Sequence, residues 1–254
     1  MTDPIAISLV TGGGRGIGRA IAVRLARETP VLVVGRAQAA LETVCGAITQ
    51  VGGTAAFCSG DVSDPATAER AVHLVRERGW VVRNLICNAG IGGGGRTETF
   101  DPEKWRTVFA VNVHGSFYFV QACLPGMLEQ RRGTICLMSS ILGVKGHKYQ
   151  AAYTASKHAL VGLARALAQE YGKRGVVCVP LCPGFVESDM TRRTIHGLVE
   201  HQHLSEAEAE KRVADTNPQK RIIPAEEVAE AVALVCAGDV PALSGHPLIL
   251  SGGE

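Results

Sequence analysis

The stretch Thr11-Gly-Gly-Gly-Arg-Gly-Ile-Gly18 decides the fold of this chain. The apolar run Ile5–Thr11 leads into it and predicts a buried strand, and the residues from about Ile17 to Glu28 predict a helix after it. A glycine-rich turn between a strand and a helix is typical of the first unit of a doubly wound α/β fold.

The glycines of this turn have separate physical tasks. Gly12 allows a sharp turn, Gly16 lets the backbone approach a pyrophosphate, and Gly18 lets the helix pack close to the sheet. The phosphates then lie at the positive N-terminus of the helix. We therefore expect a dinucleotide to contact Gly12, Arg15, Gly16, Ile17 and Gly18.

Short apolar runs alternate with longer amphipathic segments along the rest of the chain, which predicts a parallel sheet covered by helices on both faces. We expect a single domain, residues 1–254, with a Rossmann-type doubly wound parallel sheet that binds ligands beyond the carboxyl ends of its strands. The later strands are expected at Val31–Gly35, Ala55–Ser59, Asn84–Asn88, Thr134–Ser139, Val176–Cys182 and Pro247–Leu250. The later helices are expected at Ala39–Val51, Pro65–Glu77, from Pro102, and at Phe117–Gln130, Ala152–Tyr171 and Glu226–Ala237.

Residues Glu187–Lys220 interrupt this alternation, because they are polar, helical in pattern and contain no strand. An insertion near 187–220 in a sheet enzyme predicts a helical lid over the site. The alternative is a plain surface excursion.

Composition argues against several classes of partner. The net charge of the 254 residues is +2 with Lys and Arg scattered, whereas nucleic-acid binding needs a concentrated basic surface, so we expect no nucleic-acid partner. The start Met1-Thr-Asp-Pro has no basic run and does not resemble a signal peptide. No stretch approaches the roughly 18 apolar residues of a membrane span. We expect a cytoplasmic protein with no membrane partner.

The eight cysteines do not form a metal-binding pattern, because no Cys-x-x-Cys pair occurs. Several lie in or beside strand-like runs, where cysteine acts as a small hydrophobe: Cys58, Cys87, Cys136 and Cys178. Three nearby histidines have the polar surroundings of a solvated helix: His196, His201 and His203. We therefore expect no metal site.

The end of the second expected strand bears on cofactor choice. Dinucleotide-binding folds that take NAD place an acid there for the ribose 2′-hydroxyl, but this chain has Gly35 followed by Arg36. An arginine can pair with the 2′-phosphate of NADP, and Arg15 can approach the same phosphate. We therefore expect NADP(H); in the alternative, Arg36 stacks on adenine and NAD(H) binds.

Two further strand ends are candidate cofactor contacts. Asp61-Val62 follows the third strand, and its acid can accept a hydrogen bond from the adenine amine. Asn88-Ala-Gly90 ends the fourth strand, where small residues permit close approach of a cofactor. The candidates are Asp61, Val62, Asn88, Ala89 and Gly90.

Tyr153 and Lys157 are four residues apart on an expected helix, so both project from one face. Hydride transfer to a carbonyl needs a proton donor, and a nearby ammonium lowers the pKa of a phenol toward the working range. Ser140, after the fifth strand, can hold a carbonyl beside Tyr153. Asn112 is a poor helix-interior residue, so we expect a kink there that binds a water joining Lys157 to solvent. The alternative is a tolerated polar residue.

These motifs, in this order, resemble the short-chain dehydrogenase/reductase family over essentially the whole chain. The resemblance rests on Thr11-Gly-x-x-x-Gly-x-Gly18, Asp61, Asn88-Ala-Gly90, Asn112, Ser140, Tyr153-x-x-x-Lys157 and Pro183-Gly184. It implies that Tyr153 is the catalytic acid/base and that Ser140 orients the carbonyl. It also implies that Lys157 binds the nicotinamide ribose and that Asn112 holds the relay water.

The resemblance implies further contacts and an assembly. Pro183, Gly184 and Val186 would line the nicotinamide, and Ser188 stands where the family commonly has a threonine contacting the carboxamide. A homotetramer or homodimer is implied, with one interface from helices near 103–130 and 152–172 and another from the C-terminal strand.

Within the family the chain is most similar to β-ketoacyl reductases, through residues 183–190 and 217–229. We expect NADPH-dependent reduction of a ketone to a secondary alcohol, with a carrier-protein or coenzyme A 3-oxoacyl thioester as one candidate. Basic lid residues can meet such a carrier or can be solvated surface: Arg192, Arg193, Lys211 and Arg212. Two alternatives stay open: an NAD-dependent secondary-alcohol dehydrogenase working oxidatively, and a non-catalytic dinucleotide-binding protein.

Overall fold

The computed structural model describes residues 4–254, so the expectation about the first residues of the chain lies partly outside the described part. The described residues form a parallel seven-stranded sheet in the order β3-β2-β1-β4-β5-β6-β7. Its strands are β1 Ile5–Thr11, β2 Val31–Gly35, β3 Ala55–Ser59, β4 Trp80–Cys87, β5 Gly133–Met138, β6 Val176–Pro183 and β7 Leu248–Leu250. The expected doubly wound α/β fold is confirmed.

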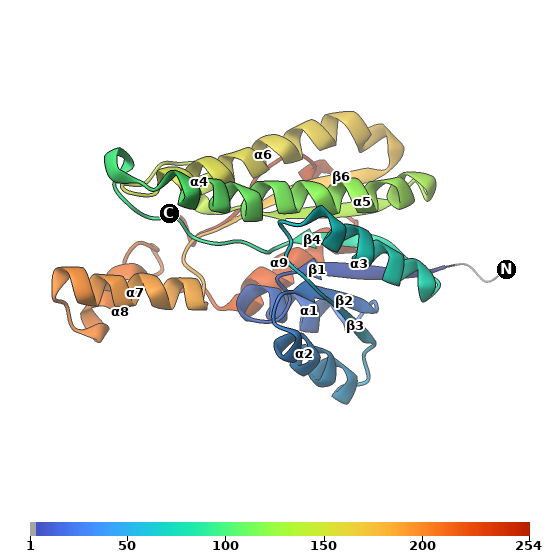
Figure 1. The fold of residues 1–254 in the computed structure, drawn as a ribbon, viewed down its shortest axis with the longest axis horizontal. Coiled ribbons are helices and arrows are strands. Elements are labelled where there is room, and N and C mark those ends of the chain that lie inside the picture. The colour runs from blue at the N-terminus through green and yellow to red at the C-terminus, as the bar shows by residue number, and fades with distance from the viewer. Residues whose placement is uncertain (1–3) are drawn as a thin grey trace.

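Helices cover both faces of the sheet (Figure 1). One core joins the sheet to α3 (Pro65–Glu77), α5 (Gly115–Glu129) and α6 (Ala151–Tyr171), which share a face with α4 (Pro102–Phe109). The second core joins it to α1 (Gly16–Leu25), α2 (Gln38–Gln50) and α9 (Ala225–Ala237). Short helical turns lie at Thr97–Thr99, Ala110–His114, Ile141–Gly143, Gly172–Arg174 and Pro241–Leu243. Apolar strands buried on both faces explain the near-continuous Val, Ile and Leu runs.

Strand β1 marks the point where the strand order reverses, because β2 lies on one side of it and β4 on the other. At such a point the loops after neighbouring strands diverge and leave a crevice for a ligand. The loops after β1 and β4 carry the glycine turn and the Asn88-Ala-Gly90 motif. The fold therefore brings both motifs to the expected end of the sheet.

The 187–220 insertion is helical, as expected, and consists of α7 (Asp189–Gln202) and α8 (Glu206–Ala214). Ser205 and Glu208 form a capping box that starts α8. Figure 1 shows this helix pair projecting beyond the sheet, at the end opposite the start of β1. It therefore lies at the carboxyl end of the strands.

The expected bounds were wrong at several elements: α1 ends at Leu25 rather than Glu28, and two departures are larger. Strand β4 begins at Trp80 rather than Asn84, because Arg83 interrupts an apolar run whose Val82 is nonetheless buried. The two helices expected around Pro102 and Phe117 are continuous, since a π-helical turn, Ala110–His114, joins α4 to α5.

The continuous helix Pro102–Glu129 is long and apolar enough to meet the length and composition criteria for a membrane span, with a mean hydropathy of 1.2. This differs from the expectation that no stretch approaches that limit. Of the most apolar 18-residue stretch of this helix, 44% is buried inside the protein. Phe119 and Met127 of the helix lie in the hydrophobic core with β4 and β5. A core helix of this kind meets the same criteria without a membrane.

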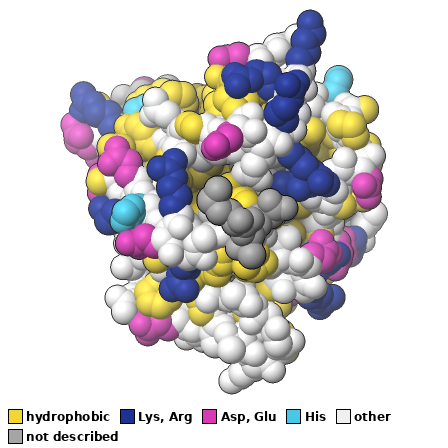
Figure 2. All heavy atoms as spheres, turned by 90° about the vertical axis from the view of Figure 1, so that its right-hand side faces the viewer, with side chains coloured by type: hydrophobic (Ala, Val, Ile, Leu, Met, Phe, Trp, Pro, Cys, Tyr) yellow, Lys and Arg dark blue, Asp and Glu magenta, His cyan; other side chains and the backbone are white. Residues whose placement is uncertain are grey.

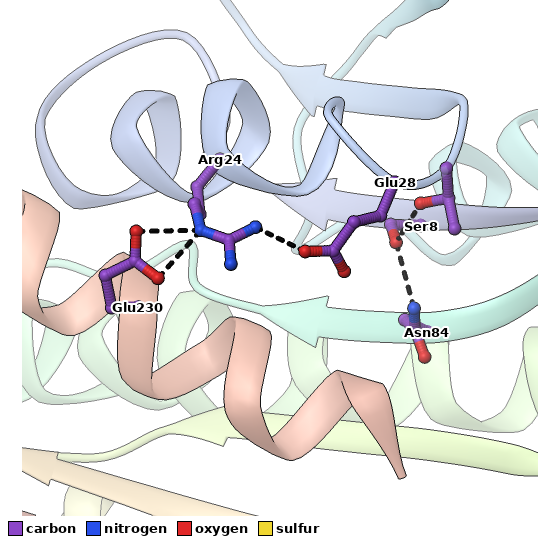
Figure 3. Close-up of polar contacts among 6 residues, drawn as sticks. Ser8, Arg24, Glu28, Asn84 and Glu230 are labelled. Carbon is purple, nitrogen blue, oxygen red and sulfur yellow. Dashed lines mark hydrogen bonds and ion pairs between the residues drawn. The ribbon is translucent and has the colours of Figure 1, made fainter.

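Arg24 links α1 to α9 beneath the sheet (Figure 3). Its Nε donates to both carboxylate oxygens of Glu230 at 2.8 Å, and its Nη1 donates to Glu28 at 2.6 Å. In the same view, Asn84 Nδ2 donates to Ser8 Oγ at 3.0 Å and joins β4 to β1. These contacts tie α1 to α9 and β4 to β1.

Figure 2 shows the end of the molecule opposite the lid helices, where basic and acidic side chains are interspersed. This mixed surface agrees with the net charge of +2. It lacks, on this face, the concentrated positive charge that a phosphate backbone requires.

Candidate active site

The glycine turn has the geometry of a tight cradle. Gly12 and Gly16 have φ of +66° and +49°, a left-handed conformation that glycine adopts without steric penalty. A Cβ on Gly18 would lie 2.1 Å from the Gly12 carbonyl oxygen, so no larger side chain fits there. Helix α1 begins at Gly16, and Arg15 makes no side-chain capping bond to it. The backbone N–H groups of its first turn can therefore receive a phosphate.

Asn88 fastens the end of β4 to this turn. Its Nδ2 donates to the Thr11 and Gly12 carbonyl oxygens at 3.1 and 3.3 Å. The Thr11 hydroxyl accepts from the backbone N–H groups of Asn88 and Ala89 at 3.0 and 3.1 Å. The sequence indicated only close cofactor approach here, whereas the Asn88 side chain shapes the turn itself.

Arg36 and Asp61 lie beyond the ends of β2 and β3. Arg36 is exposed. Asp61 Oδ1 accepts from the Ser63 hydroxyl and N–H at 2.7 and 2.9 Å, and these bonds lower the pKa of Asp61, with a smaller effect from Arg36. Val62 is buried against Gly115. The ends of β2 and β3 therefore present the exposed guanidinium of Arg36 and the Asp61 carboxylate, whose pKa is lowered.

Helix α7 begins beside the glycine turn. The Ser188 Cβ lies 3.7 Å from where a Cβ on Gly16 would stand. Arg15 Nη1 pairs with Asp189 Oδ2 at 3.1 Å, although both side chains are largely exposed. Arg15, expected at the cofactor phosphate, is thus also in contact with the lid.

A hollow of about 500 Å³ lies between the lid helices and the segment 220–222, and Ser188, Thr191 and Arg192 contribute to its lining. Two of the basic lid residues have partners of their own, because Lys211 pairs with Asp215 at 2.6 Å and Arg212 donates to Gln202 at 2.6 Å. Arg192 lines this hollow together with Lys220, Arg221 and the acids Glu187 and Glu210.

Lys157 and Tyr153 share one face of α6, as their spacing predicted. Lys157 is 3% exposed, and its Nζ lies 5.4 Å from the centre of the Tyr153 ring. The ammonium donates to the Met138 carbonyl oxygen at 2.7 Å, which holds it at the end of β5. Ser140 follows that strand, and its hydroxyl is close enough to Tyr153 to lower the phenol pKa in part. Phenol, ammonium and hydroxyl are therefore gathered at one point.

The protonation of this pair differs from the expectation. Burial raises the pKa of Tyr153 to about 12, and the opposing effect of Ser140 is smaller. Burial also lowers the pKa of Lys157 to about 8. We expected the ammonium to lower the phenol pKa, but in the chain alone burial dominates, because a phenolate in a poorly solvated place is unfavourable.

Asn112 lies in the π-helical turn Ala110–His114, so the expected distortion is present. Its Oδ1 accepts from the Ile91 N–H at 2.8 Å, and its Nδ2 donates to the Ile91 carbonyl and the Ser156 hydroxyl, both at 3.0 Å. A Cβ on Gly90 would lie 3.3 Å from Asn112 Oδ1 and 3.4 Å from Lys157 Nζ. Asn112 therefore lies beside the ammonium, while its role in holding a water stays a prediction.

The segment after β6 carries the expected residues Gly184, Val186 and Ser188. Val186 is buried and forms a bridge with Ile223, and Gly184 follows the buried Pro183. Ser188 caps α7 by accepting from the Thr191 N–H at 3.3 Å. Sequence reasoning missed Thr191, whose hydroxyl donates to the Val186 carbonyl at 2.6 Å, because a threonine in a polar helix carries no distinguishing signal.

All eight cysteines are free thiols, six of them buried. Among residues 4–254, no three His, Cys, Asp or Glu side chains gather in a way that could hold a metal ion. His196, His201 and His203 are exposed on and after α7, as a solvated helix requires.

The family model for short chain dehydrogenases matches residues 6–198. The chain belongs to this family. It is 33% identical to the Escherichia coli K12 protein 3-oxoacyl-(acyl-carrier-protein) reductase FabG over 97% of this chain and 96% of that one. It is 34% identical to a putative ketoacyl reductase of Streptomyces coelicolor, over 99% and 98% of the two chains.

Solved structures agree with this membership of the short-chain dehydrogenases. A crystal structure of an actinorhodin polyketide ketoreductase with NADPH superimposes with a TM-score of 0.94 at 33% identity, covering 99% of this chain and 97% of that one. Levodione reductase gives a TM-score of 0.92 at 31% identity, with the same coverage. The chain is therefore an oxidoreductase of a family that binds a nicotinamide dinucleotide.

The glycine cradle yields a stability prediction for this short-chain dehydrogenase. Gly18→Ala places a methyl group against the Gly12 carbonyl, so we expect it to lower the free energy of unfolding by about 3 kcal/mol, as overpacking does, and to abolish dinucleotide binding. Urea denaturation and fluorescence titration with NADPH measure both effects.

Gly46→Ala is the matched control, because Gly46 lies on α2 with open space around it. Alanine favours a helix there, so the control should gain about 0.5–1 kcal/mol and keep its affinity. Equal behaviour of the two variants would contradict the assigned geometry.

The buried ammonium yields a titration prediction. Of the seven lysines, we expect Lys157 to give a signal that titrates near pH 8, in NMR spectra of protein labelled with ¹³C at lysine Cε. Lys157→Met should remove the early signal. Between pH 8 and about 10.4 the unfolded chain retains a proton that the folded chain has lost, so this group makes the fold more stable as pH rises through that window. A spectrum in which no lysine signal titrates near pH 8 would refute the assignment.

Proposed function

We propose that this short-chain dehydrogenase reduces a ketone to a secondary alcohol with NADPH. The observation that carries the proposal is the gathering of Ser140, Tyr153 and Lys157 at the end of β5 and on α6. It lies at the carboxyl edge of the sheet, beside Gly90 at the end of β4, and the glycine cradle lies at the same edge. A phenol, a cation and a hydroxyl beside a dinucleotide cradle fit carbonyl reduction, because that reaction needs both a hydride and a proton.

NADPH, when bound, supplies the hydride that reaches the carbonyl carbon. Ser140 donates a hydrogen bond to the carbonyl oxygen and holds it beside Tyr153. The phenol of Tyr153 gives its proton to that oxygen, so one hydride and one proton convert the ketone to the alcohol. Lys157 stabilises the phenolate left behind, and Asn112 holds a water that returns a proton toward Lys157.

The pKa values of the free chain support this direction of proton transfer. Tyr153, with a pKa raised to about 12 by burial, keeps its proton until a developing alkoxide draws it away. Lys157, with a pKa of about 8, is mostly protonated at pH 7 and can release its proton without a large penalty. Both groups are therefore suited to donate.

NADPH is preferred over NADH in this proposal, because Arg36 is exposed beyond β2 and Arg15 lies on the glycine turn. Two guanidinium groups favour the 2′-phosphate. The remaining cofactor contacts are proposed as Gly12, Gly16, Ile17, Gly18, Asp61, Val62, Asn88, Ala89, Gly90, Pro183, Gly184, Val186 and Ser188.

A 3-oxoacyl thioester is the substrate class we favour. Relatives of this chain are named 3-oxoacyl and ketoacyl reductases, and this supports the choice. Arg192 at the hollow beneath α7 and α8 supplies one cation for an anionic carrier, and the helix pair would act as the lid. Free thiols suit the reducing cytosol, where we place the protein.

We also propose a single 1–254 domain that assembles as a homotetramer or homodimer. Exposed apolar side chains support contacts along α4 and α5 and along the outer strand β7: Trp105, Phe117 and Ile249. The small-molecule carbonyl compound and a second copy of the chain are the partners of this proposal, with no nucleic acid or membrane.

The proton-donor role has a direct test. Tyr153→Phe removes only the phenolic hydroxyl, so we expect kcat for NADPH-dependent ketone reduction to fall about 100-fold or more while the Kd for NADPH stays close to that of the wild type. Absorbance of NADPH with a ketone panel that includes an acetoacetyl thioester measures turnover. Tyr171→Phe, at the far end of α6, is the control and should retain activity. Full turnover by Tyr153→Phe would remove the mechanism, and binding of NADPH by a wild type that reduces no ketone would favour the non-catalytic alternative.

Cofactor choice is tested by charge reversal. Arg36→Asp loses a charge-assisted bond to the 2′-phosphate and adds repulsion, so the ratio of kcat/KM for NADPH to that for NADH should fall about 100-fold. Arg27→Asp, on the loop between α1 and the amino end of β2, serves as the control for a general change in charge. A wild type that prefers NADH would instead support the oxidative alternative.

A further inference from the structure

Ser139 is adjacent to Ser140 in the chain but makes a different contact. Its hydroxyl donates to the backbone carbonyl oxygen of Lys157 at 2.9 Å, and the residue is 3% exposed. Successive residues of an extended chain point their side chains in opposite directions, so only one of the two serines can face Tyr153. Ser139 is therefore turned toward the backbone of α6.

Lys157 is consequently held at both of its ends by consecutive residues. The Met138 carbonyl accepts from its Nζ at 2.7 Å, and the Ser139 hydroxyl donates to its carbonyl at 2.9 Å. The end of β5 is itself fixed, because the Ser139 N–H donates to the Leu181 carbonyl of β6 at 2.8 Å. The end of β5 thus fixes the position of α6 at Lys157 relative to the sheet.

The contact is closely enclosed. A Cβ on Gly143 would lie 2.2 Å from Ser139 Oγ and 3.0 Å from the Lys157 carbonyl oxygen, so a side chain there would collide with both. On another side lies Cys182, a buried thiol whose pKa is raised by burial and lowered in part by the Ser139 side chain and the Ser140 backbone. Water therefore has little room to replace the Ser139 hydroxyl.

We propose that Ser139 is a positioning residue, whose hydroxyl fixes α6 at Lys157 and so sets Tyr153 and Lys157 at their working distance from Ser140. The proposal rests on the proposed reductase function for its kinetic consequence. Misplacement of reacting groups by about 1 Å can reduce a rate about 100-fold, so a partial loosening of α6 should be visible in kcat.

The test compares three serine variants. Ser139→Ala should lower kcat about 10-fold with little change in the Kd for NADPH, because it loosens the proton donor and leaves the glycine cradle intact. It should also raise the NMR titration midpoint of Lys157, since water reaches a less tightly held ammonium. Ser139→Cys retains a weak donor and should fall between the wild type and Ser139→Ala in both measurements.

Ser8→Ala is the matched control. Ser8 is also a buried serine of the sheet, and its hydroxyl lies 2.8 Å from the Thr29 hydroxyl, away from α6. It should leave kcat and the Lys157 midpoint unchanged, whatever it does to stability. A Ser139→Ala protein with wild-type kcat and an unshifted Lys157 midpoint would overturn the proposal, as would equal changes in Ser8→Ala.

Measuring both kcat and the Lys157 midpoint separates the proposed reductase function from the positioning role of Ser139. If the wild type reduces no ketone, the proposed function fails, while the Lys157 midpoint of Ser139→Ala still decides whether Ser139 positions α6. If the wild type is active and Ser139→Ala leaves both kcat and the Lys157 midpoint unaltered, the positioning role alone fails.

Discussion

The hydrogen bond from the Lys157 ammonium to the Met138 carbonyl is the interaction on which the candidate active site depends. A cation that is 3% exposed is unfavourable unless polar partners replace water, and a carbonyl at the end of a strand supplies a fixed one. Because β5 is paired on both sides, that carbonyl has a fixed position. The ammonium, and the phenol one helical turn before it, take their positions from the sheet.

A second constraint operates at the neighbouring strand ends. Gly12 and Gly18 approach each other so closely that the chain can only form a narrow turn, and Asn88 reaches across from β4 to fasten it. The glycine turn and the cluster of Ser140, Tyr153 and Lys157 are therefore placed by the neighbouring strands β1, β4 and β5 of one sheet. Their separation is set by strand spacing rather than by flexible loops.

Much of this arrangement could be predicted from the sequence, for identifiable reasons. β1, β2, β3 and α3 have the expected bounds because turn residues flank their apolar runs. The strand–glycine–helix order and the Tyr153–Lys157 spacing predicted where the site lies. Sequence could not reveal that Met138 contributes a backbone carbonyl, since every residue has one. It also could not decide which way Ser139 and Ser140 face, nor that burial outweighs the ammonium in setting the Tyr153 pKa.

The ion pair between Arg15 and Asp189 has a consequence for the timing of events at the site. Asp189 is the first residue of the outer helix α7, and its partner Arg15 lies on the glycine turn. Any anion that recruits the Arg15 guanidinium must share it with this carboxylate or displace it. Anion binding at the glycine turn and the position of α7 are therefore thermodynamically linked. By reciprocity, whatever shifts α7 also alters the affinity of the glycine turn for that anion.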